Sequence, residues 1–399
     1  MTIKPELGYE VAGLERVVAV MTYMRSGSGL MSSLLDSHPN AIATPDCILT
    51  GFYEFWDEYG HFPTTELVPT FVDYYGTIFD AREPTKCPRA GKDFGTYANY
   101  TNLGPGQDEC MVVDRETFEK VMLDIIGGQE TVSRKLFFQA LHVAYSRAIG
   151  QEAQNPIIAY GLHIAKPEII KQFLQDFPQA KFLQMVRDPI SALGSTFRSR
   201  INHGITNPLL GVGVVTGALY HGIPVPLNNA ANWRSVKLED LHQKPGETMK
   251  KLSDWLEIPW DDSLLASTIN GKQWWNEKNT ISISGFSPAV AAQRFEEFIP
   301  AFDRIKLDIL LGFKSRVWGY SKRGWTRSRF AQFLALPLIL LPFRLERISI
   351  TASINAAANR PSFAQRTTKT LSALFQGRKV ILRAWHHCQR RGPKEVRLL

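Results

Sequence analysis

Three mainly apolar runs define the architecture that this sequence predicts. They cover residues 17–21, 157–162 and 180–186. Runs of this length and composition are typical of strands that are buried on both faces of a parallel sheet. Segments with helical spacing follow each of them. We therefore expect an α/β fold, a P-loop-like parallel sheet flanked by helices, with ligands at the carboxyl ends of its strands.

The spacing of apolar residues also predicts the helices between these strands. We expect helices at residues 64–79, 115–150 and 245–256, from Lys166-Pro167-Glu168 onward, and from near Ile190. Pro167 suits an early helical position, where its missing N–H is harmless. Residues 201–232 break the pattern with Gly, Pro and Asn, and a stretch this long predicts a binding loop, a lid or an ordinary surface excursion.

Charge divides the chain into two parts. The chain has 399 residues and a net charge of +8, yet residues 325–399 hold fourteen Lys or Arg against two acids, a net of +12 that leaves −4 for residues 1–324. We expect residues 1–324 to form the globular domain and residues 325–399 a mainly helical, basic extension. A basic extension on a nearly neutral body indicates an anionic surface as its partner.

The extension contains one apolar segment, Phe330 to Phe343, in which only Gln332 is polar. The segment is too short to span a bilayer, contains two prolines and is flanked by arginines. We expect it to rest on an anionic membrane surface, with packing against the body or a partner subunit as the alternative. Nothing in the extension resembles a base-reading motif, so no nucleic-acid partner is expected.

The N-terminus and the cysteines bear on the cellular compartment. Residues 1–10 lack the apolar stretch of a secretory signal, so we expect a cytoplasmic protein, peripheral at the membrane. Four cysteines without a C-x-x-C pattern or a zinc-like His spacing indicate reduced thiols and no metal site. A disulfide between Cys87 and Cys110 remains open.

The most informative segment is residues 25–39, RSGSGLMSSLLDSHP, which joins the first predicted strand to a Leu-rich helix. A Gly and Ser loop at this junction lets backbone N–H groups converge on an anion, and the helix dipole and Arg25 add attraction. The kinase-type phosphate loop and the three-glycine dinucleotide fingerprint are both absent. A phosphate or sulfate site and a plain strand-to-helix turn fit this loop equally well by itself.

A second motif follows the third predicted strand. Arg187-Asp188-Pro189 comes directly after it, and Ser195 lies two helical turns beyond Arg187 on the same side of the helix. One guanidinium and one hydroxyl on one side can hold a second phosphate.

Together these motifs resemble the sulfotransferases that use 3′-phosphoadenosine 5′-phosphosulfate (PAPS), and most closely their tyrosylprotein and bacterial-type branch. That branch has an R-S-G-[ST]-[ST] loop before a Leu-rich helix ending in His-Pro, and an R-D-P motif with a Ser eight residues after the Arg. Leu238-Glu239-Asp240-Leu241, Pro245 and Leu252 also follow the family's Y-E-D-L…P…L…L run. The resemblance covers roughly residues 16–320.

The resemblance implies where the donor binds. Arg187 and Ser195 would bind the 3′-phosphate, and the first loop would bind the 5′-phosphosulfate through Arg25, Ser26, Gly27, Ser28, Gly29 and Leu30. Two departures affect these details. Gly29 stands where a second hydroxyl residue is usual, and Leu238 stands where the family often has a Tyr near the nucleotide.

The resemblance also implies catalytic roles. Lys166 falls where the family has a Lys near the transferring sulfuryl group. Arg25 of the first loop is the second cation expected to act on that group. Asp46, seven residues beyond Pro39, falls at the position of the family's carboxylate base. The other candidate bases are His163, His38 and Glu54.

The expected reaction is in-line transfer of a sulfuryl group from PAPS to the hydroxyl of a small molecule, glycan or lipid, without a metal. A polar, aromatic segment, Trp274 to Lys278 with Ser282, Ser284 and Gly285, is expected near the donor and acceptor. Two other functions remain open: an ATP-dependent small-molecule kinase with a degenerate phosphate loop, and a non-catalytic nucleotide-binding membrane adaptor.

Overall fold

The structure of the protein is a computed structural model of the 399-residue chain. The residues it describes are 11–45, 48–83, 100–127, 129–163, 166–202, 210–221, 230–278, 281–293, 295, 298–320, 336–344, 346–348, 351, 363–391 and 397–399.

The body is built on a five-stranded parallel sheet with the strand order β2-β3-β1-β4-β5. The strands are β1 (Val17–Met21), β2 (Ala41–Ala43), β3 (Ile157–Leu162), β4 (Lys181–Val186) and β5 (Trp233–Lys237). β1 pairs with β3 from Val17↔Ile158 to Met21↔Leu162, so the two strands end at the same edge. The predicted α/β fold and its three strands are confirmed, whereas β2 and β5 were not predicted.

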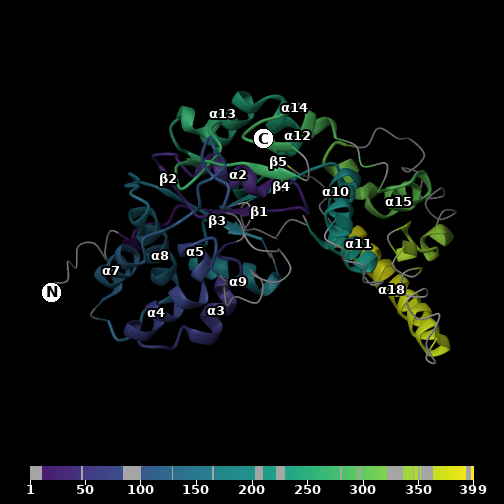
Figure 1. Ribbon diagram of the computed structural model, residues 1–399, viewed down its shortest axis with the longest axis horizontal. Helices are drawn as coiled ribbons and strands as arrows, with labels where there is room; N and C mark the ends of the chain where they lie inside the picture. The colour runs from purple at the N-terminus through teal and green to yellow at the C-terminus, as the bar shows by residue number, and fades with distance from the viewer. Residues whose placement is uncertain are drawn as a thin grey trace.

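Helices lie on both sides of the strands in Figure 1, with α12, α13 and α14 above them and α3, α4, α5 and α9 below. Their bounds are α2 (Ser28–Leu35), α3 (Phe52–Tyr59), α4 (Thr64–Tyr74), α5 (Gly76–Phe79), α7 (Arg115–Ile126), α8 (Arg134–Ala148), α9 (Pro167–Asp176), α10 (Pro189–Asn202), α11 (Leu210–Tyr220), α12 (Leu238–Gln243), α13 (Pro245–Leu256), α14 (Pro288–Ala292), α15 (Ala301–Val317) and α18 (Phe363–Arg391). The predicted helices at 64–79, 115–150 and 245–256 are confirmed, the first two as helix pairs.

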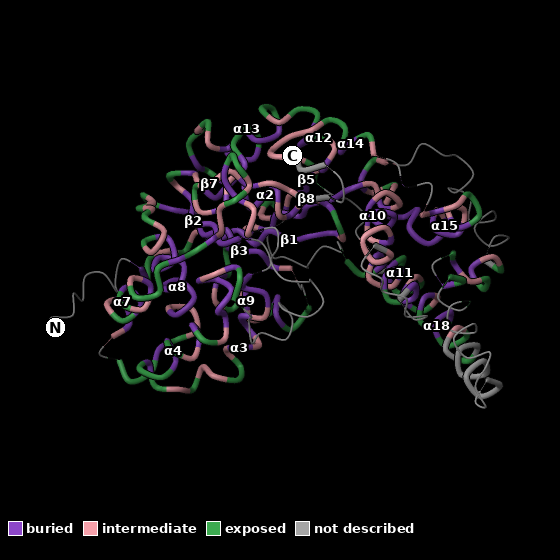
Figure 2. The backbone as a smooth tube through the Cα atoms, viewed as in Figure 1, coloured by how far each residue is buried: buried purple, intermediate pink, exposed green. Residues whose placement is uncertain are grey.

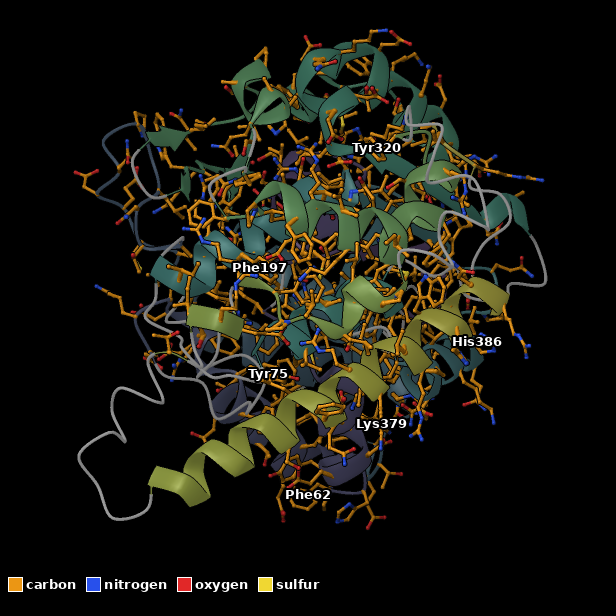
Figure 3. All side chains as sticks on the ribbon, turned by 90° about the vertical axis from the view of Figure 1, so that its right-hand side faces the viewer. Phe62, Tyr75, Phe197, Tyr320, Lys379 and His386 are labelled. Carbon is orange, nitrogen blue, oxygen red and sulfur yellow. The ribbon has the colours of Figure 1, made fainter. Side chains whose placement is uncertain are left out.

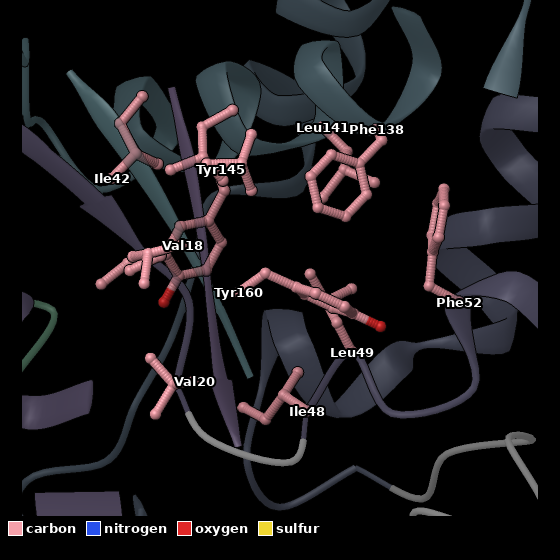
Figure 4. Packing of buried hydrophobic residues seen from close by; sticks show 14 of the residues in the cluster. Val18, Val20, Ile42, Ile48, Leu49, Phe52, Phe138, Leu141, Tyr145 and Tyr160 are labelled. Carbon is pink, nitrogen blue, oxygen red and sulfur yellow. The ribbon is translucent and has the colours of Figure 1, made fainter. Parts of the chain in front are cut away.

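The main core joins the sheet to the helices below it. Aromatic rings fill much of it. The ring centroids of Phe52 and Tyr160 each lie 5.2 Å from the ring centroid of Phe138, in edge-to-face contact. Figure 4 shows Tyr160 between Val18 of β1 and Phe52 of α3, with Phe138 and Leu141 of α8 together above it. Figure 2 shows β1 and β3 buried along their length, as unbroken apolar runs predict, whereas β5 is only partly buried at Arg234 and Lys237.

A second apolar cluster joins α10, α11, α15 and the C-terminal segments. The prediction that residues 201–232 are irregular is wrong over 210–220, where α11 lies. Its sequence, rich in Gly and Val, has low intrinsic helix propensity, and burial of Val212, Val215 and Leu219 against neighbouring helices stabilises it instead. Residues 203–209 and 222–229 lie outside the described part.

The described segments of the basic extension pack against the body. A 3-10 helix, η5 (Leu336–Leu340), leads to Phe343, which is buried. The C-terminal half of α18 packs along α11, and Arg378 of α18 forms a buried ion pair with Glu346. Leu398 forms an isolated parallel β-bridge with Ser235 of β5 at the sheet edge. Residues 330–335 of the apolar segment are outside the described part.

No helix within the described residues is long and apolar enough to span a membrane.

Candidate functional site

The first loop runs from β1 to α2 and is tied to the neighbouring strand β4. The Ser26 hydroxyl accepts a hydrogen bond from Tyr23 N at 3.0 Å and donates one to Met185 O at 2.9 Å. Met24, at φ 52°, takes the left-handed conformation that non-glycine residues seldom adopt. The Ser26 side chain therefore holds the loop in shape, and its predicted contact with a ligand would have to come from the backbone.

Gly27 is the residue that lets this loop turn into α2. Its φ is 90°, and a Cβ at this position would lie 2.5 Å from Leu238 Cδ1. Leu238, the first residue of α12, is buried. The loop thus needs glycine both for its backbone conformation and for the close approach of Leu238.

The N-terminus of α2 directly follows the first loop. Helix geometry leaves the N–H groups of the first turn, from Ser28 to Leu30, without intrahelical acceptors. The first turn holds no acidic residue, and no side chain caps it. Because the positive end of the helix dipole also lies here, this turn favours an anionic ligand. Gly29 adds no side chain to the turn.

Arg187, the predicted 3′-phosphate contact, reaches the first loop. It follows β4 directly, is buried, and its Nη1 lies 3.5 Å from the carbonyl oxygen of Arg25. Its Nη2 lies 3.4 Å from the carbonyl oxygen of Val290 in α14. Burial lowers the pKa of Arg187, while the carboxylates of Glu239 and Asp188 oppose this shift. The two predicted arginines therefore lie together at the carboxyl edge of the sheet.

Two carboxylates hold the turn that presents Arg187. Asp188 Oδ2 accepts a hydrogen bond from Ser191 N at 2.8 Å at the start of α10. Glu239 Oε1 accepts one from Asp188 N at 3.2 Å, and its Oε2 accepts one from the Tyr320 hydroxyl at 2.6 Å. Glu239 thus links the turn after β4 to α12 and to the end of α15.

Ser195 is buried on α10, and its hydroxyl finds no hydrogen-bond partner among the described residues. A buried hydroxyl without a partner costs about 1–3 kcal/mol, so a ligand or a water molecule that supplies an acceptor here would be stabilised. Phe295 lies against the preceding residue, because a Cβ on Gly194 would be 2.4 Å from Phe295 Cβ. An anion held by Arg187 would give the Ser195 hydroxyl an acceptor.

Two further arginines, Arg198 and Arg200, lie close enough to Arg25 to affect its pKa, and no role was predicted for either. The Arg25 side chain still reaches solvent, but partial desolvation and the charges of Arg198, Arg187 and Arg200 lower its pKa. The guanidiniums of Arg187 and Arg198 both lie over the Phe295 ring, at 5.3 and 5.0 Å from its centroid. Four mutually repelling cations favour binding of a polyanion.

The sequence contained a signal for Arg198. It lies three residues after Ser195, and this helical spacing places both residues on one side of α10, the helix that follows Arg187. Phe295 gave no such signal, since its contact with Arg187 joins positions more than 100 residues apart.

Lys166, the predicted sulfuryl-group contact, precedes α9. Its Nζ lies 3.7 Å from Glu54 Oε1 on α3. Lys166 and Glu54 therefore come together near the carboxyl ends of β3 and β2. Asp46, the predicted base, lies outside the described residues.

The candidate histidines have different surroundings. His38 Nε2 lies 3.0 Å from Pro259 O, and its Nδ1 accepts a hydrogen bond from Asn40 N, so both ring nitrogens are used to hold the end of α2. His163 follows β3 and lies near His221. Burial, together with the charges of Lys314 and His163, lowers the pKa of His221 to about 4.

The aromatic segment after α13 forms two short hairpins, of β6 (Thr268–Ile269) with β7 (Lys272–Gln273) and of β8 (Asn276–Lys278) with β9 (Ile281–Ile283). Trp274 is buried in the main core, and Trp275 Nε1 donates to Gly104 O at 2.7 Å. Both tryptophans thus make structural contacts.

Cys110 and Cys388 are free thiols. Within the described part of the chain, no group of three His, Cys, Asp or Glu side chains is arranged to hold a metal ion.

Comparison with known proteins gives one family match. The model of the sulfotransferase family matches residues 18–262, which is more than half of the chain and includes Arg25, Arg187 and Ser195. No curated protein matches the chain.

Among solved structures, the chain is similar to the sulfotransferase domain of the Synechococcus PCC 7002 olefin synthase, with 15% identity, a TM-score of 0.44, and coverage of 77% of this chain and 95% of that one. It is also similar to the sulfotransferase domain of the curacin biosynthetic pathway, with 14% identity, a TM-score of 0.40, and coverage of 81% and 96%. For sulfotransferase STF9 of Mycobacterium avium the identity is 15%, the TM-score 0.35, and the coverage 65% and 68%. By its family-model match, this chain belongs to the sulfotransferase family.

Proposed function

We propose that the protein transfers a sulfuryl group from PAPS to the hydroxyl of an acceptor. The observations that carry this proposal are the buried hydroxyl of Ser195, which has no hydrogen-bond partner among the described residues, and the guanidinium of Arg187, which reaches the loop of Arg25. Two joined anion pockets suit a donor with phosphate groups on both its 3′ and 5′ positions. An ATP-dependent kinase would need only one such pocket together with Mg²⁺.

The residues present fit this donor. Arg25 and the first turn of α2 would hold its 5′ end, and Arg187 with Ser195 would hold its 3′-phosphate, aided by Arg198. When bound, PAPS supplies an activated sulfuryl group. Lys166 would neutralise charge that develops on the oxygens during transfer.

A carboxylate would accept the proton of the acceptor hydroxyl. Asp46 remains the proposed base on the family's pattern. Glu54 is the second candidate, because its carboxylate lies 3.7 Å from Lys166, and His163 is the third. Replacing the base should remove the acidic limb of the pH-rate profile, and the comparison of Asp46→Asn, Glu54→Gln and His163→Gln variants identifies it.

The donor can be tested by calorimetric titration with adenosine 3′,5′-bisphosphate in EDTA. We expect binding that Ser195→Ala weakens about 10- to 100-fold and Arg187→Ala weakens further, because each loses a hydrogen bond to a charged group. Binding of 5′-AMP, which lacks the 3′-phosphate, should be nearly unchanged in both variants. Arg82→Ala, which removes an exposed arginine paired with Asp80, is the control.

Equal wild-type affinity for the bisphosphate and for 5′-AMP would contradict the assignment of the second pocket. A preference for ATP with Mg²⁺ would favour the kinase, and binding without turnover would favour the adaptor.

The acceptor, the location and the domain division are parts of the same proposal. The acceptor is a hydroxyl-bearing small molecule, glycan or lipid, and labelled-sulfate transfer onto a cell extract would identify it. We propose that residues 1–324 are the catalytic domain and that the enzyme acts in the cytoplasm. We further propose that residues 325–399 bring it to an anionic membrane.

A further inference from the structure

Helix α18 has one face that is packed against the body and an opposite face that is not. Residues Gly377, Ile381, Ala384 and Cys388 are buried on the packed face. A Cβ on Gly377 would lie 2.4 Å from Val212 Cγ2, so α18 and α11 are in close backbone contact here. This contact fixes which side of α18 faces outward.

The outward side is a continuous stripe of exposed residues, Phe375, Lys379, Arg383, His386 and Arg390. Their spacing of three or four residues keeps them within about 80° of one another around the helix, roughly opposite the packed face. Lys379 and His386 both lie along the outer side of α18 in Figure 3. We call these five residues the outer stripe.

All Lys, Arg, Asp and Glu positions of α18 are basic. Residues 363–391 contain seven Lys or Arg and no Asp or Glu. Glu346 pairs with Arg378, which is buried on the packed side. The cations of the outer stripe therefore have no acidic residue of α18 to offset them.

The outer stripe also carries an apolar side chain. Phe375 is 73% exposed, more than any other large apolar residue in the described part of the chain. The next is Leu340 of η5, at 55%, which belongs to the same C-terminal extension. An exposed aromatic ring in a row of cations is typical of a helix that lies in a lipid interface, where the ring enters the acyl boundary and the cations meet phosphates.

From this arrangement we propose that the outer stripe of α18 docks on an anionic lipid surface. In the apolar segment before Phe343, Ile339 is buried whereas Leu340 and Leu341 are exposed, so the predicted contact extends from that segment to α18. This inference does not depend on the sulfotransfer proposal. A bilayer bound here would hold the catalytic body beside membrane-borne molecules.

Co-sedimentation of the full chain with sucrose-loaded vesicles tests the proposal. We expect binding to phosphatidylcholine vesicles with about 30 mol% phosphatidylserine at about 150 mM salt, and little binding to phosphatidylcholine alone. Neutralising the stripe in the triple variant Lys379→Gln, Arg383→Gln, Arg390→Gln should weaken partitioning about 100-fold, at roughly fivefold per cation. Phe375→Ser should weaken it about tenfold.

The matched control removes the same charge elsewhere. Lys244, Lys250 and Lys251 are exposed on or beside α13, and their replacement by Gln should leave partitioning unchanged. If this control weakens partitioning as much as the stripe variant does, net charge alone causes the binding and the proposal fails. It also fails if a mixed-sequence DNA duplex of equal charge displaces the protein from the vesicles.

The titration with adenosine 3′,5′-bisphosphate separates the two proposals. The stripe variant should bind this nucleotide as the wild type does, which also shows that it folds. A wild-type protein that binds vesicles but not the nucleotide would refute the sulfotransfer proposal alone.

Discussion

At the scale of single residues, Gly27 is constrained by two independent features, its φ of 90° and the approach of Leu238. We expect Gly27→Ala to lower the free energy of unfolding by about 1–3 kcal/mol and to weaken nucleotide binding, because the first loop must shift. Urea denaturation and calorimetry measure the two effects.

A double-mutant cycle isolates the contact. Gly27→Ala with Leu238→Ala should cost less than the sum of the single changes, because the shortened side chain leaves room for the new Cβ. Gly213→Ala on α11 is the control, since a Cβ there meets nothing within 4 Å and should be neutral or stabilising. Strict additivity in the cycle would show that backbone strain, and not the contact, governs the effect.

Lys314 is a second residue with a measurable signature. It is fully buried on α15, donates to the carbonyl of His221, and lies over the rings of Tyr23 and Trp318 at 5.0 and 5.4 Å. Burial lowers its pKa to about 7, against a small opposing effect of Cys388. Between this value and the usual lysine pKa, the unfolded chain binds more protons than the folded one.

Stability should therefore rise with pH above 7. We expect Lys314 to contribute an increase of about 2 kcal/mol in the free energy of unfolding between pH 7 and pH 9. Lys314→Met should flatten this rise, whereas Lys379→Met at an exposed site should not. Chemical denaturation at both pH values measures the slope, and an unchanged slope in Lys314→Met would contradict the prediction.

At the scale of elements, α18 depends on the buried pair of Arg378 and Glu346. Removing one partner leaves an uncompensated charge in the second apolar cluster, so Glu346→Ala or Arg378→Ala alone should cost about 3–5 kcal/mol. The double change Glu346→Leu with Arg378→Met should recover most of this loss. Hydrogen exchange along α18 would report the release of the helix. A single variant with wild-type protection would show that other contacts hold it.

The elements differ in how far the sequence predicts them. Strand β3 was predicted with its observed bounds, because six consecutive buried residues leave a clear apolar run. Strand β2 has only three residues, and β5 carries Arg234 and Lys237, so neither has such a run. Helix α11 was missed because its stability comes from tertiary packing, which local spacing does not encode.

The same reasoning applies to the candidate site. The sequence predicted ligands at the carboxyl ends of the strands, and Arg25 and Arg187, which follow β1 and β4, lie near each other at that edge of the sheet. It did not predict that the Ser26 hydroxyl would form hydrogen bonds with the backbone of Tyr23 and Met185. Nor did it predict that the guanidiniums of two arginines would lie over the Phe295 ring. Those contacts depend on side-chain packing between segments far apart in the sequence.

At the scale of the whole molecule, the extension and the body share the second apolar cluster, in which Phe343 and Ile381 of the extension pack with Leu310 of α15. Leu310 lies one turn before Lys314, which contacts Tyr23 at the start of the first loop. The C-terminal segments and the candidate donor site are thus joined by continuous packing through α15.

The pairing of Leu398 with Ser235 has a consequence for the solution behaviour of the protein. Ser235 N donates to Arg397 O and Leu399 N donates to Ser235 O, so the last residues cover the outer edge of β5. Deleting residues 397–399 would uncover unpaired strand groups of the kind that recruit strands from other molecules. We expect the shortened chain to form dimers and larger aggregates at concentrations where the full chain does not, which light scattering would detect; a monodisperse truncated chain would show that this edge needs no cover.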